Sequence, residues 1–111
     1  MRRREYLGQL ELMVLLSVIG GAGKSYGVSV SRDIGKQSGR DVALPSVYAA
    51  LERLERKGLV SSTLGEPTAE RGGKARTHYK PTAAGLKEAR EARDTVIRLS
   101  QGLPPWQRKP I

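Results

Sequence analysis

A change of periodicity at Gly58 constrains the fold of this chain more than any other feature. Before it, strong helix formers fill residues 46–57, apolar positions recur every three or four residues, and Pro45 suits the first helical turn. After it, Val60, Ser62 and Leu64 alternate with Ser61 and Thr63, as on the two faces of a β-strand. Gly58 is the expected left-handed cap, which allows Leu59 to fold back on the helix end. The chain therefore combines helices with at least one short strand.

Further patterns predict three more helices and a second strand. Ser25 is the expected N-cap of one helix and Thr82 that of the last. The polar, glycine-rich segment 66–75 is predicted to be a long hairpin tip. The expected order is a helix over 7–19, a helix over 25–38, a helix over 46–57, a strand over 60–64, a strand over 77–80 and a helix over 83–100.

The charge balance favours a polyanionic partner. Lys and Arg number 20 against 11 Asp and Glu, so the net charge is +9 over 111 residues, a length that suits one domain. The apolar run at 12–19 is too short to span a bilayer, and we interpret it as part of the first core helix rather than as a signal sequence. The absence of cysteine is typical of the cytoplasm. We expect a cytoplasmic protein that binds nucleic acid and not a membrane.

The composition argues against catalysis and metal binding. There is no cysteine, and His78 is the single histidine, flanked on its predicted strand by cations rather than by an orienting acid. The segment 20–25 superficially suggests a phosphate-binding loop, but Val18 stands where that motif needs glycine. We therefore expect no catalytic residues, no metal and no cofactor.

The order of elements predicts a winged helix-turn-helix, a mainly α fold with a small β-hairpin. Three helices followed by a two-stranded wing make up this module, and the helix over 46–57 is the candidate recognition helix for the major groove. We expect a DNA-binding domain over 1–81, a C-terminal dimerisation helix over 82–103 and a loose tail over 104–111.

The expected DNA contacts come from the recognition helix, the wing and the start of the second helix. Short side chains at the front of the recognition helix allow close approach to base edges, and cations behind them reach phosphates. The glycine pair of the wing tip lets backbone approach the DNA, between further cations. The expected DNA-binding residues are Ser25, Tyr26, Ser46, Val47, Tyr48, Ala49, Arg53, Lys57, Arg71, Gly72, Gly73, Lys74 and Arg76.

The first and last helices predict a homodimer. The first helix carries more apolar residues than a three-helix core needs, and the apolar stripe of the last helix would otherwise stay wet. Two recognition helices about 34 Å apart would match an inverted repeat. The expected interface residues are Leu12, Leu16, Leu86, Ala89, Arg93, Val96, Ile97 and Leu99.

Trp106 leaves two interpretations open. It either packs loosely on the dimer or forms an aromatic wall for a small planar effector.

Two other functions also remain open on composition alone: an RNA-binding winged helix and a protein-interaction adaptor.

Three stretches resemble the PadR family of bacterial winged-helix transcriptional regulators. Within 39–60, Tyr48 is followed three positions on by leucine, then by a basic–Leu–Glu step and by Lys-Gly-Leu-Val. Residues 71–85 are similar to the family's wing, with an aromatic second strand and a Thr-x-x-Gly helix start. Tyr26-Gly27 matches the opening of the second helix. The resemblance covers about residues 7–100.

The resemblance implies a homodimeric regulator, and many members of the family are repressors. Their C-terminal helices build the dimer interface. One such helix is expected here, so the chain resembles a short-tailed member, and no effector site is carried over from the family's larger C-terminal domain. Pro81 stands where the family often has leucine and is expected to shorten the second strand.

Overall fold

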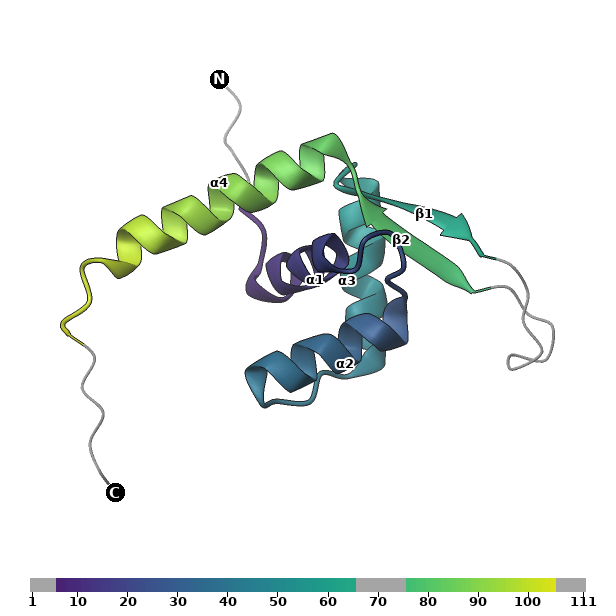
Figure 1. The fold of residues 1–111 in the computed structure, drawn as a ribbon, viewed down its shortest axis with the longest axis horizontal. Helices are drawn as coiled ribbons and strands as arrows, with labels where there is room; N and C mark the ends of the chain where they lie inside the picture. Colours follow the sequence, from purple (N-terminus) through teal and green to yellow (C-terminus); the bar gives the residue numbers. More distant parts are fainter. Residues whose placement is uncertain (1–5, 66–75, 106–111) are drawn as a thin grey trace.

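A computed structural model describes residues 6–65 and 76–105 and confirms the predicted fold (Figure 1). Four helices surround a small core, and a two-stranded hairpin extends from one side. The elements are α1 (Gln9–Gly20), α2 (Gly27–Ser38), α3 (Leu44–Arg56), β1 (Val60–Leu64), β2 (Thr77–Pro81) and α4 (Ala83–Ser100).

The junction of α3 and β1 has the predicted geometry. Gly58 adopts φ 76°, in the left-handed region. The Leu59 N–H donates to the Leu54 carbonyl at 2.9 Å, and the Gly58 N–H donates to the Glu55 carbonyl at 3.0 Å. These two bonds form a Schellman ending, which reverses the chain so that β1 starts beside the helix that precedes it.

The core lies where α1, α2 and α3 meet. In α3 the apolar positions that recur every three or four residues, Val47, Leu51 and Leu54, are fully buried, and Ala50 is buried with them. In α1 the buried positions are Val14, Leu15 and Val18, which leaves Leu16 44% exposed. The core comprises Val14, Leu15, Val18, Val30, Ile34, Val47, Ala50, Leu51, Leu54, Val60 and Ala89.

Thr82 joins the end of the hairpin to the end of α3. Its hydroxyl donates to the Gly58 carbonyl at 2.7 Å and accepts from the Gly85 N–H at 3.0 Å, which confirms it as the N-cap of α4. Gly85 is buried against the Leu59 carbonyl, and a Cβ there would overlap that oxygen. The start of α4 is therefore fixed by contacts with backbone.

The expectation that Pro81 shortens β2 is wrong. The antiparallel register runs from Leu64↔Thr77 to Val60↔Pro81, so β2 includes Pro81. A proline fits there because β2 belongs to a two-stranded sheet and is therefore an edge strand.

The expected N-cap at Ser25 is also wrong, because Tyr26 occupies that position. The Ser29 hydroxyl accepts from the Tyr26 N–H at 2.9 Å. Ser25 instead lies in a bridge to the wing, where its carbonyl accepts from the Tyr79 N–H at 2.8 Å. Its side chain is 4% exposed and is therefore not available as a phosphate contact.

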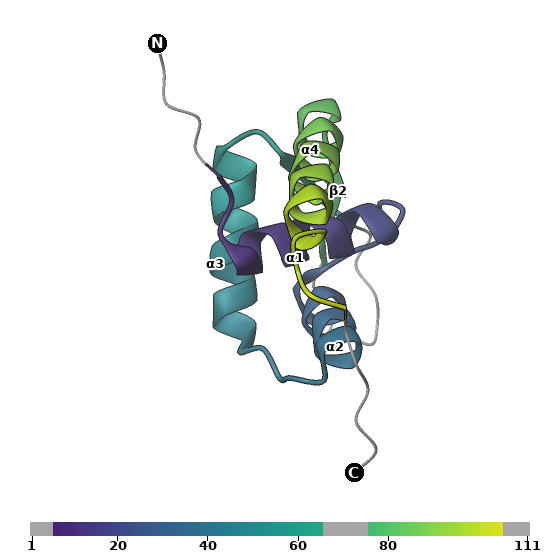
Figure 2. The same cartoon turned by 90° about the vertical axis from the view of Figure 1, so that its left-hand side faces the viewer.

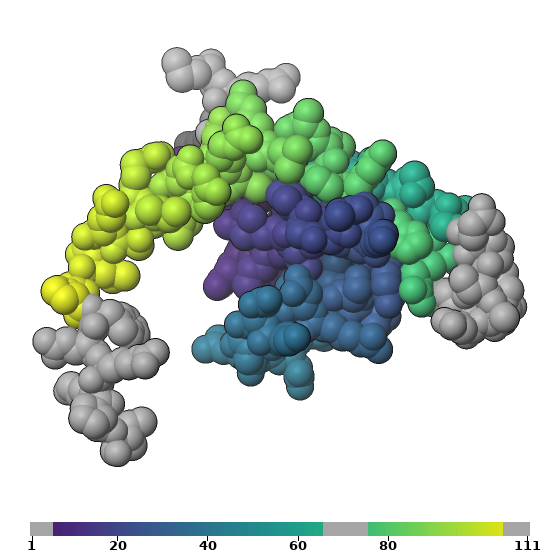
Figure 3. Space-filling view, viewed as in Figure 1, coloured from purple at the N-terminus to yellow at the C-terminus, as the bar shows by residue number. Residues whose placement is uncertain are grey.

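The first half of α4 packs on α1, and its second half projects beyond α1 and α2 (Figure 3). Ala89 is 4% exposed and belongs to the core of its own chain, so its predicted place in a dimer interface is wrong. Val96, Ile97 and Leu99 are 57%, 50% and 75% exposed. Among the described helices, none is both long and apolar enough to cross a membrane.

Candidate nucleic-acid interface

Three elements converge beside the wing. The first residues of α2, the first half of α3 and the start of β2 together enclose a hollow of about 150 Å³. Aromatic rings and one guanidinium dominate its lining. The lining residues are Tyr26, Gly27, Val28, Tyr48, Arg76, Thr77 and Tyr79.

Arg76 is held against an aromatic ring. Its guanidinium carbon lies 3.8 Å from the centroid of the Tyr26 ring, a cation–π contact. The edge of His78 meets the same ring, with centroids 6.1 Å apart and planes at 87°. The buried Nε of Arg76 has no hydrogen-bond partner among the described residues. The stack orients the Arg76 guanidinium. At least one of its hydrogen-bond donors has no acceptor among the described residues.

Tyr48 lies over the start of α2. A Cβ at Gly27 would overlap the Tyr48 ring, so the close approach depends on glycine. The ring of Tyr48 nevertheless remains 46% exposed. Burial raises the pKa of the neighbouring Tyr79 phenol, and the charge of Glu55 adds to the effect, so this phenol stays neutral at physiological pH.

The exposed side of α3 carries four of the predicted contacts, Ser46, Tyr48, Ala49 and Arg53. Ser46 is exposed and Ala49 is half-buried on this side. Val47 is fully buried, so the prediction that it faces base edges is wrong. Further along the same helix, Glu52 and Arg56 form an exposed ion pair at 3.5 Å.

Two predicted phosphate contacts on α3 have an acidic partner that sequence reasoning missed. The Glu11 carboxylate accepts from the Lys57 ammonium at 2.8 Å and lies 3.7 Å from the Arg53 Nε. Glu11 sits in the first turn of α1, which Figure 2 shows against α3. Burial alone would raise the pKa of Glu11, but Lys57, Arg53 and the Gly8 N–H together lower it. No local sequence signal pairs residues this far apart.

Several predicted contacts lie outside the described residues. These are Arg71, Gly72, Gly73 and Lys74 in the wing tip, and Trp106 in the tail. Within the described residues no group of three His, Asp or Glu side chains comes close enough to hold a metal ion.

A comparison with models of protein families shows which family this chain is related to. The model of the transcriptional regulator PadR-like family matches residues 15–91, which include α2, α3, the hairpin and half of α4. The chain belongs to the PadR-like family. This is a family of transcriptional regulators. A comparison with curated proteins found no match.

Solved structures of PadR-like proteins share this fold. A transcriptional regulator from Clostridium thermocellum is 26% identical, with coverage of 83% of this chain and 84% of that chain and a TM-score of 0.69. A PadR-like regulator from Bacillus cereus is 27% identical, with coverage of 85% and 93% and a TM-score of 0.61. A PadR-like transcription factor from Bacteroides fragilis is 24% identical, with coverage of 85% of both chains and a TM-score of 0.72.

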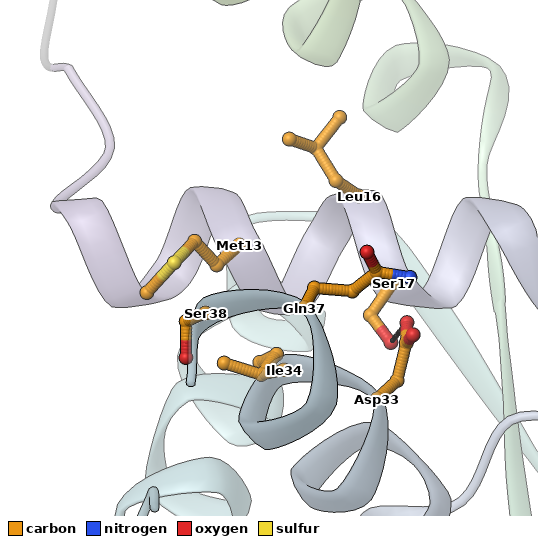
Figure 4. Close-up of a pocket in the computed structure, with 7 residues that line it drawn as sticks. All are labelled: Met13, Leu16, Ser17, Asp33, Ile34, Gln37 and Ser38. Atoms are coloured by element: carbon orange, nitrogen blue, oxygen red, sulfur yellow. Dashed lines mark hydrogen bonds between the residues drawn. The ribbon is translucent and has the colours of Figure 1, made fainter. Parts of the chain in front are cut away.

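This PadR-like protein has a second hollow, between α1 and α2, of about 410 Å³ (Figure 4). Met13, Leu16 and Ile34 form its apolar part, and Leu16 points toward α4. The Ser17 hydroxyl donates to the Asp33 carboxylate at 2.7 Å across the gap between the helices. The hollow therefore lies along the junction of α1 and α2.

Proposed function

We propose that this PadR-like protein is a sequence-specific regulator that binds double-stranded DNA as a homodimer at an inverted repeat and represses transcription. The observation that carries the proposal is the convergence of Arg76, Tyr26 and Tyr48 beside the exposed side of α3. A cation and a phenol that flank an exposed helix suit a duplex, since the helix enters the major groove while its flanks meet phosphates.

The roles divide by side-chain chemistry. Ser46 and Ala49 lie near base edges, where short side chains let the helix approach closely. Tyr48, Arg53 and Lys57 contact phosphates from α3, and Arg76 does so from the wing, joined by the wing-tip residues 71–74. Tyr26 acts through Arg76, which its ring orients.

Dimerisation is supported by the exposed apolar side of α4. Val96, Ile97 and Leu99 are 57%, 50% and 75% exposed, and a cluster of exposed apolar side chains is typical of an interaction surface. Leu12, Leu16, Leu86 and Arg93 complete the proposed interface.

We expect Ile97→Glu to give a monomer in light scattering and to abolish cooperative binding to two half-sites. Ser100→Glu, on the same helix, is the control. A dimeric I97E protein would contradict this interface.

The function is tested by selecting bound fragments from genomic DNA and measuring their affinity by fluorescence anisotropy. We expect an inverted repeat, with weaker binding to RNA of the same sequence. Arg76→Gln should weaken binding to all duplexes and flatten the salt dependence by about one unit. Lys87→Gln on α4 is the matched control. Preference for RNA, or binding that survives high salt, would overturn the proposal.

Repression and its relief form the final part of the proposal. A dimer bound over a promoter excludes the polymerase, so transcription in vitro should fall with operator occupancy. Relief by a small aromatic effector is supported by the size and apolar lining of the hollow between α1 and α2. Trp106 is the single tryptophan, so ligand titrations can follow its fluorescence. Ligands that change neither fluorescence nor DNA affinity would contradict an effector site.

A further inference from the structure

We infer that Glu11 is an internal competitor of DNA phosphates that limits the affinity of this protein for DNA of any sequence. The inference rests on the proposed function, because it concerns two cations to which that proposal gives phosphate contacts. It adds a residue of α1, outside the recognition helix and the wing, to those that set DNA affinity.

The geometry places one carboxylate between two cations of α3. The Glu11 Oε2 accepts from the Lys57 Nζ at 2.8 Å, and the Oε1 lies 3.7 Å from the Arg53 Nε. The Glu11 side chain is 12% exposed, against 44% for Arg53 and 35% for Lys57. The acid is thus covered, while both cations remain accessible from solvent.

This arrangement lowers the charge that α3 offers to a duplex. Two cations and one carboxylate leave a net charge of one on this flank of the helix. A phosphate that approaches Arg53 or Lys57 is attracted by the cation and repelled by the carboxylate behind it. Counterion release is driven by the net neutralisation of phosphates, so the carboxylate also flattens the salt dependence of binding.

A purely structural function for Glu11 makes a different prediction. The Glu11 carboxylate also accepts a hydrogen bond from the Gly8 N–H. This bond caps the start of α1, so Glu11 supports the fold. If support were its only role, removing the charge would leave DNA affinity unchanged or lower it. Competition with phosphate predicts an increase, and the sign of the change separates the two.

The experiment compares the full-length protein with Glu11→Gln on a labelled non-operator duplex, by anisotropy over roughly 50–300 mM potassium chloride. The amide preserves size and can still accept hydrogen bonds. We expect E11Q to bind about three- to tenfold more tightly at the low-salt end and its salt dependence to be steeper by about one unit. Asp94→Asn, which changes net charge equally on α4, should have a much smaller effect.

A second test measures the effect of Lys57→Gln in the natural protein and in the E11Q variant. In the presence of Glu11 the loss of Lys57 should cost little affinity, whereas in the E11Q background it should remove much of the gain. Glu11→Asp, which keeps the charge, should bind like the natural protein. Unchanged or weaker binding by E11Q, with its fold intact by circular dichroism, would overturn the inference. Failure of the natural protein to bind any duplex would instead overturn the proposed function, and this inference with it.

Discussion

The guanidinium of Arg76 stacks on the ring of Tyr26, so that the first residue beyond the wing tip is tied to the start of α2. The two residues are distant in sequence, and one belongs to the hairpin while the other caps a helix. The contact couples the direction of the wing to the helix-turn-helix. A wing cation is thereby held in the hollow that Tyr48 also lines.

Loss of this stack is expected to weaken DNA binding without unfolding the protein. Tyr26→Leu keeps an apolar side chain but removes the π face that orients Arg76. A cation–π contact contributes about 0.5–2 kcal/mol, so we expect about a 2- to 30-fold loss of affinity in anisotropy titrations. Tyr26→Phe retains the ring and should bind like the natural protein. Equal losses in both variants would show that the hydroxyl, not the ring, matters.

Gly27→Ala is expected to destabilise the protein through Tyr48. Alanine normally favours a helix over glycine, but here its Cβ would overlap the Tyr48 ring. We expect a loss of about 1–3 kcal/mol in the free energy of unfolding, measured with urea. The double variant Gly27→Ala with Tyr48→Ala should recover most of that loss, because the ring is gone. A purely additive double variant would contradict the contact.

Gly85→Ala is expected to be more damaging, because the overlapping atom is the Leu59 carbonyl oxygen. A side chain can rotate away, but this carbonyl also accepts from the Thr82 N–H at 3.1 Å and cannot move without opening the start of α4. We expect a cost of about 3 kcal/mol and a lower Tm. Gly20→Ala, where an added Cβ has no atom within 4 Å, is the control and should be neutral or slightly stabilising.

Glu11 is expected to stabilise the fold in a pH-dependent way. Its pKa is lower in the folded protein than its ordinary value of 4.5, so its contribution is fully present above that value. The contribution is lost as the pH falls from 4.5 through the folded pKa. The natural protein should exceed E11Q by about 1 kcal/mol in free energy of unfolding at pH 7, and the two should converge in acid. A difference that persists or grows in acid would contradict the ion pairs.

Local signals predicted the elements of this fold well. Glycine is the residue type that most readily adopts a left-handed conformation, and Gly58 does so between α3 and β1. Thr82 can cap α4 because its hydroxyl accepts from the Gly85 N–H. Periodicity likewise predicted the buried stripe of α3. These features depend on residues within a few positions of one another, so the chain itself carries the information.

Where local signals allowed more than one structure, tertiary packing determined which one forms. Ser25 is a better N-cap than Tyr26 by propensity, yet its backbone pairs with Tyr79 and its side chain is buried, which moves the start of α2 by one residue. Val47 follows Ser46 directly, but the packing of α3 in the core buries Val47 and leaves Ser46 exposed.

The sequence by itself determined the order of helices and strands, the caps at Gly58 and Thr82 and the excess of positive charge, because each arises from neighbouring residues or from composition. Only the tertiary structure decided that Arg76 stacks on Tyr26 and that Glu11 faces Arg53 and Lys57. Those pairs join residues far apart in the chain, and their distances depend on how α1, α2 and the hairpin pack around α3. Periodicity places a side chain on one face of its own element, whereas packing determines which face of another element it meets.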